Sequence, residues 1–200
     1  MAGSTPVEIE RKFLVDREAF EKACPTVSGQ RIRQGYWQVE RLPFFFERML
    51  DALEGLSLTT HLPALVEGGP EALEMRLRQR ADRFWVTFKS RAQLPSGGVA
   101  EYEEELPADV AESFLDQVDV QLSKTRYELP LGGGLTLEVD LFDDLGGLAL
   151  AEVEIPALDT PLPSLPAWVG EEVTGQPAYF NRQLAERVLP SSSSRVSPSP

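Results

Sequence analysis

Two carboxylates and a lysine alternate near the start of the chain. Glu8, Glu10 and Lys12 are each separated by one residue, and the side chains of a β-strand alternate between its two faces. All three would therefore share one strand face. Two carboxylates can hold a hard divalent cation through oxygen, and an ammonium group can bind an anion as a compact charge. The pattern suits a site for a metal ion and a phosphate, although a solvated edge strand would also tolerate it.

The same alternation of charged and apolar residues recurs along the chain. The further charged positions are Glu74, Arg76, Arg78 and Arg80, Lys89, Glu101, Glu103 and Glu105, Lys124 and Arg126, Glu138 and Asp140, and Glu152 and Glu154. Three of the four lysines lie in these segments, and Lys22 is the exception. Lysines that served mainly as solvating residues would favour helix surfaces and loops. The repetition therefore favours a binding surface made of several strand faces.

Eight strands and four helices are expected to carry these residues. Period-two alternation predicts the strands, and apolar residues three or four apart predict the helices. Asp16 is the expected N-cap of the first helix. The predicted strands are Val7–Val15, Gln30–Val39, 73–80, 83–90, 99–106, Leu122–Leu129, Leu135–Leu141 and Leu148–Ile155. The predicted helices are Arg17–Ala23, Glu40–Gly55, a segment from Pro107 to Val118, and Ala178–Leu189.

So many strands with few helices between them predict a mainly antiparallel sheet of the α+β class. Such a sheet forms a sandwich or a lipocalin-like barrel with charges outside, or an inverted barrel with charges inside. The strand pattern alone is compatible with both. Amphipathic helices that need an apolar partner surface favour the inverted barrel, and so do charged faces that mix acids with bases and can pair internally. We expect an eight-stranded closed antiparallel tunnel with a charged interior, flanked by amphipathic helices.

Composition narrows the functional classes. The net charge of −13 argues against nucleic acid or an anionic membrane surface as a partner. The chain has one cysteine, Cys24, which argues against an internal disulfide and a thiolate metal site. It has one histidine, His61, which argues against imidazole-based chemistry. No apolar run approaches membrane-spanning length. We expect a cytoplasmic protein that is a monomer or a homodimer.

The ordered motifs resemble those of the CYTH family, the triphosphate tunnel metalloenzymes. Glu8-Ile9-Glu10-Arg11-Lys12 is similar to the E-x-E-x-K opening of that family. Further similar stretches follow in order: Gln34-Gly35-Tyr36, Arg76-Leu77-Arg78, Thr87-Phe88-Lys89, Glu101-Tyr102-Glu103, Lys124-Thr125-Arg126-Tyr127, Glu138-Val139-Asp140, Ala151-Glu152-Val153-Glu154, Trp168-Val169-Gly170 and Tyr179-Phe180-Asn181. The resemblance implies a tunnel of eight antiparallel strands with a charged bore, which agrees with the strand-face pattern.

The resemblance also implies roles for the charged residues. The expected triphosphate-binding residues are Lys12, Arg76, Arg78, Lys89, Lys124 and Arg126. The acidic set comprises Glu8, Glu10, Glu101, Glu103, Glu138, Asp140, Glu152 and Glu154, of which some would hold Mg²⁺ or Mn²⁺ and others would orient the bases or the attacking water. Lys12, Tyr36 and Glu10 are the expected catalytic residues.

The resemblance covers about Val7–Leu189. We expect one domain over residues 1–189, followed by a Ser/Pro-rich tail over 190–200 that is expected to be disordered. Residues 39–73 have no counterpart in short family members. This inserted segment is expected to pack on the barrel wall and to be dispensable for the chemistry, and a lid or a dimer contact is the alternative.

The function expected from the resemblance is metal-dependent hydrolysis of inorganic tripolyphosphate to phosphate and pyrophosphate. Hydrolysis of nucleoside or thiamine triphosphate and adenylyl cyclisation are alternatives within the family. A non-catalytic polyphosphate or nucleotide sensor is a rival, although an anion binder gains little from eight carboxylates. A lipocalin-like carrier would instead bind an apolar ligand without metal.

Overall fold

The structure is a computed structural model of the chain, and it describes residues 7–37, 73–93 and 99–188. Most of the inserted segment, including the helix predicted over Glu40–Gly55, lies outside the described residues, as does the predicted tail. No helix in the described part combines the length and the apolar character that crossing a bilayer requires.

The described strands form one antiparallel sheet, as predicted. Its order is β1-β6-β5-β4-β3-β7-β8-β9-β2-β10, and every neighbouring pair is antiparallel. The strands are β1 (Val7–Glu8), β2 (Glu10–Val15), β3 (Gln30–Tyr36), β4 (Leu73–Arg80), β5 (Arg83–Gln93), β6 (Val99–Leu106), β7 (Val120–Gly132), β8 (Leu135–Phe142), β9 (Ala149–Glu154) and β10 (Val169–Glu172).

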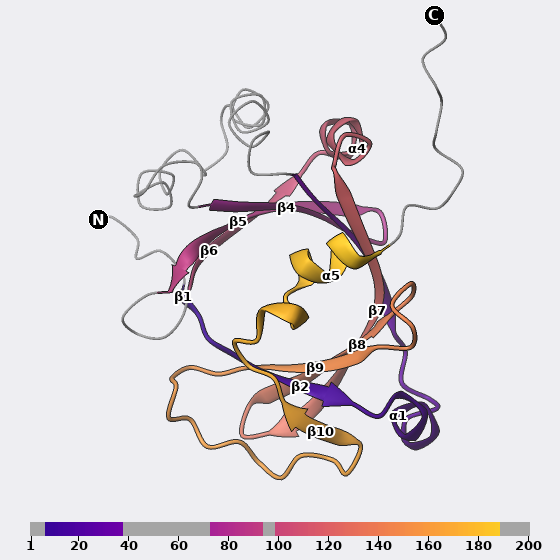
Figure 1. Cartoon of the computed structure of the whole chain (residues 1–200), viewed down its shortest axis with the longest axis vertical. Helices are drawn as coiled ribbons and strands as arrows, with labels where there is room; N and C mark the ends of the chain where they lie inside the picture. The colour runs from indigo at the N-terminus through magenta and orange to yellow at the C-terminus, as the bar shows by residue number, and fades with distance from the viewer. Residues whose placement is uncertain (1–6, 38–72, 94–98, 189–200) are drawn as a thin grey trace, which may run out of the picture.

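The sheet curls into a ring, but its ladder of hydrogen bonds is not closed by a pairing of edge strands (Figure 1). The strand predicted over Val7–Val15 is split at Ile9 into β1 and β2. β1 pairs with β6, and β2 pairs with β9 on the other side. The covalent chain at Ile9 thus joins the two sides of the ring. Counted as one strand, β1 and β2 complete the eight long strands that the sequence predicts.

Apolar residues cover the outside of the ring, which confirms the inverted arrangement. Helix α4 (Ala108–Leu115) buries Phe114 and Leu115 in one outer cluster, with Phe84, Val86 and Phe88 of β5. Helix α1 (Arg17–Ala23) belongs to a second outer cluster through Phe20. Figure 1 shows both helices outside the ring.

Local sequence explains how α1 and β3 are placed. Asp16 caps α1 as predicted, because its carboxylate accepts a hydrogen bond from the backbone N–H of Ala19 at 3.0 Å. Phe20 then makes edge-to-face contacts with the rings of Tyr127 and Trp168. In β3, a Cβ on Gly35 would come within 2.7 Å of the side chain of Val118. Glycine therefore lets the segment after α4 approach the strand closely.

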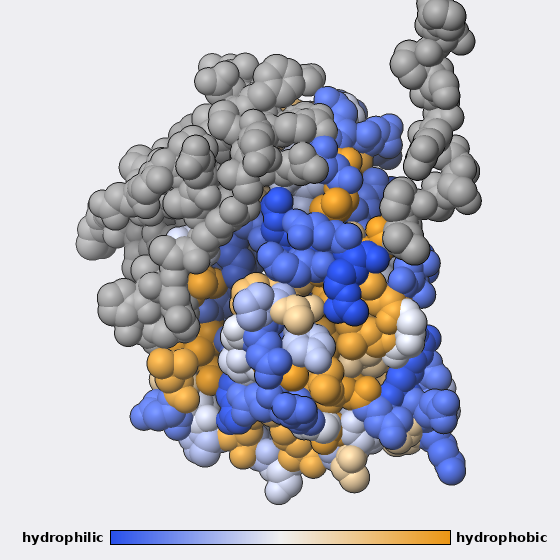
Figure 2. Space-filling view, in the orientation of Figure 1, coloured by the Kyte–Doolittle hydropathy of each residue, from blue (hydrophilic) through white to orange (hydrophobic). Residues whose placement is uncertain are grey.

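The C-terminal helix is not on the outer wall, where the sequence pattern placed it. The short helix η3 (Pro177–Tyr179) and α5 (Asn181–Arg187) lie across the ring (Figure 1). Leu184 and Ala185 pack inside on an apolar cluster that contains Tyr36, Leu122, Phe142 and Leu150. These strand residues share the inner face with the charged ones, so α5 finds an apolar surface at one end of the bore. Hydrophilic residues gather over α5 on the face that Figure 2 shows.

One strand was not predicted. Strand β10 extends the sheet beside β2, where Glu172 pairs with Arg11. Three of its four residues are exposed, so it lacks the alternation that identifies a half-buried strand. The chain after β10 is fixed to Lys12, whose backbone N–H donates to Thr174 Oγ1 at 3.0 Å and whose carbonyl accepts from Val173 N–H at 2.8 Å. β10 thereby carries the chain to the mouth of the bore.

Candidate active site

The bore holds a cavity of about 580 Å³. Every predicted site residue lines it except Lys124 and Asp140. The lining residues from the strands are Glu8, Ile9, Glu10, Lys12, Tyr36, Glu74, Arg76, Arg78, Arg80, Lys89, Ser90, Val99, Glu101, Glu103, Arg126, Glu138, Glu152 and Glu154. The C-terminal segment adds Thr174, Gly175, Phe180, Asn181, Arg182 and Gln183.

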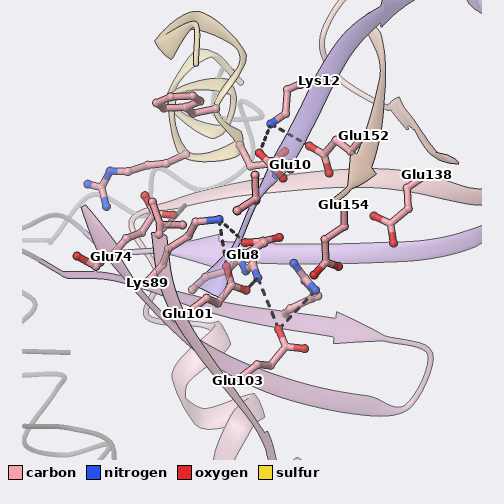
Figure 3. Close-up of a pocket in the computed structure, with 18 of the residues that line it drawn as sticks. Glu8, Glu10, Lys12, Glu74, Lys89, Glu101, Glu103, Glu138, Glu152 and Glu154 are labelled. Carbon is pink, nitrogen blue, oxygen red and sulfur yellow. Dashed lines mark hydrogen bonds and ion pairs between the residues drawn. The ribbon is translucent and has the colours of Figure 1, made fainter. Parts of the chain in front are cut away.

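One wall of the cavity is formed by β4, β5 and β6 and carries three predicted cations. Arg76 donates to Thr87 Oγ1 at 3.0 Å and to Glu101 at 3.1 Å. Arg78 lies 3.4 Å from Glu103. Lys89 bridges Glu8 at 2.6 Å and Glu101 at 3.0 Å, and Figure 3 shows its ammonium between these two carboxylates. The carboxylates hold the cations in place with their nitrogen atoms directed into the bore.

The opposite wall is formed by β2, β7, β8 and β9 and is richer in carboxylates. Lys12 lies 2.9 Å from Glu152 and 3.4 Å from Glu10 (Figure 3). Arg126 donates to Glu152 at 2.9 Å and also pairs with Glu138. Glu154 has no ion pair with any described residue and is exposed. Basic and acidic groups therefore face each other across one cavity.

Lys124 and Asp140 lie on the inner face beside the apolar cluster under α5, where Lys124 is opposite Phe142 and Asp140 is opposite Leu150. Both side chains are completely buried and they pair with each other. Asp140 also receives two hydrogen bonds from Arg126, at 2.7 Å from Nε and 2.6 Å from Nη2. Burial and the neighbouring guanidinium lower the pKa of Lys124 to about 8, although Asp140 opposes them. The structure thus places Lys124 where it supports Arg126 through Asp140, away from the cavity surface.

Burial shifts the pKa of a carboxyl pair in the basic wall. Desolvation and a hydrogen bond with Glu101 raise the pKa of Glu8 to about 8, against the attraction of Lys89. The pKa of Glu101 falls to about 2, because the hydrogen bond from Glu8 and the charges of Arg76 and Lys89 outweigh its desolvation. The pKa values of the two carboxyls are thus pushed apart, upward for Glu8 and downward for Glu101.

The predicted catalytic pair of Lys12 and Tyr36 is held in its protonated form. Burial opposes the charge of Lys12, but Glu152 and Glu10 outweigh it and raise the lysine pKa. Burial also raises the pKa of Tyr36, which is fully buried at the cavity wall and whose hydroxyl accepts a hydrogen bond from Gln34 at 2.9 Å. In this arrangement Lys12 is an ammonium and Tyr36 a phenol.

The carboxylates suit Mg²⁺ or Mn²⁺, which prefer oxygen ligands. No three Asp, Glu, His or Cys residues in the described ranges already converge as a metal-binding group. However, the Lys89 ammonium contacts both Glu8, at 2.6 Å, and Glu101, at 3.0 Å, so these two side chains lie close together. Glu10 and Glu154 are directly opposite in the β2–β9 register, and both line the cavity. The donor set therefore fits a hard cation.

Sequence reasoning left several lining residues out of the site. Glu74 and Arg80 share the alternation of Arg76 and Arg78, so a signal for them was present. Arg182 had no comparable signal, and Asn181 appeared only in the family-like stretch Tyr179-Phe180-Asn181, because both belong to α5 and reach the cavity through the position of that helix. Arg182 is fixed there by donating to the carbonyl of Trp37 at 2.8 Å.

A ring of strands whose bore combines clustered cations with carboxylates is suited to bind a polyanion, and its carboxylate oxygens are of the kind that a hard metal ion prefers. No family model matches the chain. It is 34% identical over 120 residues to the inorganic triphosphatase of Nitrosomonas europaea, spanning 58% of this chain and 76% of that protein. It is 29% identical over 184 residues to the inorganic triphosphatase of Acetivibrio thermocellus, spanning 90% and 93% respectively.

A solved structure agrees with these relatives. The structure of the inorganic triphosphatase NE1496 matches at a TM-score of 0.50 and 28% identity, covering 92% of this chain and 97% of that one. The chain belongs to the CYTH family of triphosphate tunnel metalloenzymes.

Proposed function

We propose that the protein is a divalent-metal-dependent triphosphatase that hydrolyses inorganic tripolyphosphate to phosphate and pyrophosphate. The observation that carries this proposal is the cavity itself, in which Lys12, Arg76, Arg78, Lys89 and Arg126 converge beside carboxylates. The names of the two bacterial relatives support it.

In this proposal the five cations bind the phosphate oxygens. Arginine suits this role because its planar fork makes two parallel hydrogen bonds to an oxyanion. Each cation except Arg78 lies within 3.1 Å of a carboxylate, so the cations are oriented before substrate arrives. Asp140 binds both Lys124 and Arg126, so in this proposal Lys124 positions Arg126 through Asp140 and does not contact phosphate itself.

The carboxylates that would hold the metal are those facing the cavity: Glu8, Glu10, Glu101, Glu103, Glu138, Glu152 and Glu154. Asp140 is separated from it by burial. When bound, Mg²⁺ or Mn²⁺ would withdraw negative charge from the phosphate oxygens. Water attacks the terminal phosphorus, the bridging P–O bond breaks, and phosphate and pyrophosphate leave.

The proposal is tested by phosphate release from tripolyphosphate, ATP and thiamine triphosphate, each with Mg²⁺, with Mn²⁺ and with a chelator. Tripolyphosphate should be hydrolysed fastest and only with metal. Faster release from ATP or thiamine triphosphate would assign the organic substrate instead. Tight binding of tripolyphosphate without any phosphate release would support the sensor rival.

Replacing Lys89 or Arg78 by alanine should weaken tripolyphosphate binding by about 1.5–3 kcal/mol, the contribution of a charge-assisted contact. Both side chains line the cavity, and Arg78 is buried beside a single carboxylate. Titration calorimetry measures the change. Replacing the exposed Arg31, which pairs with Asp143 outside the cavity, is the control and should leave affinity unchanged. Wild-type affinity in both cavity variants would contradict their role.

Tyr36→Phe should lower the rate roughly ten- to a hundredfold if the phenol takes part in proton transfer. The raised pKa values of Lys12 and Tyr36 make the base form of either group scarce at neutral pH. The wild-type rate should therefore climb into the alkaline range. The pH–rate profile of Tyr36→Phe at saturating Mg²⁺ measures both effects. An unchanged rate and alkaline limb would make Tyr36 only a wall residue of the apolar cluster.

A further inference from the structure

Arg80 differs from the other cations of the cavity. It lines the bore at the third position of a row on β4, after Arg76 and Arg78. Within the described residues, no carboxylate forms an ion pair with Arg80, whereas Arg76 and Arg78 both have such partners. Its Nε is buried without a hydrogen-bond partner there, as is the Nε of Arg78, but Arg78 still has Glu103 as an ion-pair partner. A buried guanidinium N–H without a partner costs free energy, which an anionic ligand would recover.

An aromatic side chain holds Arg80 in place of a carboxylate. The guanidinium lies 5.6 Å from the ring centre of Trp85, and Arg83 lies 5.0 Å from the same ring. Arg83 is itself fixed by Glu105, to which its Nε donates at 2.7 Å. A cation–π contact leaves the hydrogen-bond donors of the guanidinium available. Arg80 is therefore oriented without its charge being neutralised.

The position of Arg80 along the bore determines which phosphoryl group of a linear ligand its guanidinium can contact. Arg76 is opposite Tyr36 in the β3–β4 register, near the end covered by α5, whereas Arg80 is opposite Arg83 at the β4–β5 turn. Alternate residues of a strand are roughly 7 Å apart, so the three arginines span roughly 14 Å. Neighbouring phosphorus atoms share one bridging oxygen and lie closer together. The arginine row thus extends further than three phosphoryl groups.

We propose that Arg80, held on Trp85, forms a subsite for a fourth phosphoryl group, so that the bore also accepts linear tetrapolyphosphate. This proposal rests on the proposed function, because the first three phosphoryl groups occupy the tripolyphosphate site. Arg80 contacts the added phosphoryl group at the end away from α5, and Trp85 is its positioning residue.

The test compares tripolyphosphate with tetrapolyphosphate. Calorimetry in metal-free buffer measures binding without turnover, and steady-state kinetics with Mg²⁺ gives kcat and KM. Arg80→Met should weaken tetrapolyphosphate binding about tenfold or more, as expected for one charge-assisted contact. Tripolyphosphate binding should change less than about twofold on the same reasoning. Arg80→Lys keeps the charge and should recover part of the loss.

Two further variants separate the aromatic support from general damage. Trp85→Leu should weaken tetrapolyphosphate binding about two- to fivefold, the lower range for one cation–π contact, and Trp85→Phe should recover it. Arg83→Met is the matched control, because it removes the outer cation, which does not line the cavity. It should leave both affinities near wild type.

Equal loss of affinity for both ions in Arg80→Met would overturn the proposal by placing Arg80 in the tripolyphosphate site. Wild-type affinity for both ions would overturn it by removing Arg80 from the ligand. The proposed function fails separately, if wild-type protein binds tripolyphosphate but never hydrolyses it. The binding comparison for Arg80 would still decide the subsite in that case.

Discussion

Asp140→Ala should lower the free energy of unfolding by about 3–5 kcal/mol, the usual cost of removing one partner of a buried ion pair. The carboxylate is completely buried and is bound by Lys124 and by two nitrogen atoms of Arg126. Its removal leaves two cations with less compensation in a site that water cannot reach. Denaturant unfolding at pH 7 in metal-free buffer measures the change.

Glu105→Ala is the matched control for this loss. Glu105 also pairs with an arginine, but that pair is solvent-exposed, so its loss should cost far less stability than the loss of Asp140. Lys124 and Arg126 hold the pKa of Asp140 below its ordinary value despite desolvation. This contribution to stability is therefore present above the ordinary carboxyl pKa and lost as the pH falls through the lowered one. Equal costs for the two variants would mean that the Asp140 network is solvated.

The face of each strand could be predicted from the sequence. The alternation of Glu8, Glu10 and Lys12 holds in the structure, because the period of two is a property of the extended backbone. Which face is inside was open from alternation alone. The need of the helices for an apolar surface favoured the inverted barrel, and the outer clusters under α1 and α4 bear this out.

Depth within the bore could not be predicted. Lys124 and Arg126 have the same parity on β7, yet Lys124 is buried beside the inner cluster under α5 and Arg126 lines the cavity. Alternation gives the face of a residue but not its level along the tunnel axis. The position of α5 inside the ring could not be predicted for a related reason. Its apolar stripe shows that it packs on a surface, and only the inner cluster around Tyr36 and Leu150 shows which one.

Glu10→Gln should reduce hydrolysis of tripolyphosphate at least about a thousandfold, within the range for loss of an essential acid–base or metal-binding group. Glu10 lines the cavity opposite Glu154 and 3.4 Å from Lys12, so its carboxylate can serve the metal or the attacking water. The amide keeps the shape of the side chain but removes the negative charge. The fold should persist, because the Glu10 side chain is 31% exposed and lies as far as 3.4 Å from its ion-pair partner Lys12.

The measurement is phosphate release with saturating Mg²⁺ or Mn²⁺, together with a thermal melt and calorimetry of tripolyphosphate binding. Melting should match the wild type, and binding in metal-free buffer should be kept or strengthened, because one negative charge leaves a site for a polyanion. Glu172→Gln is the control, since Glu172 pairs with Arg11 on the exposed β10 edge and does not line the cavity. It should retain full activity. An active Glu10→Gln variant would remove Glu10 from the chemistry, and the metal would then have to be held by the other carboxylates of the bore.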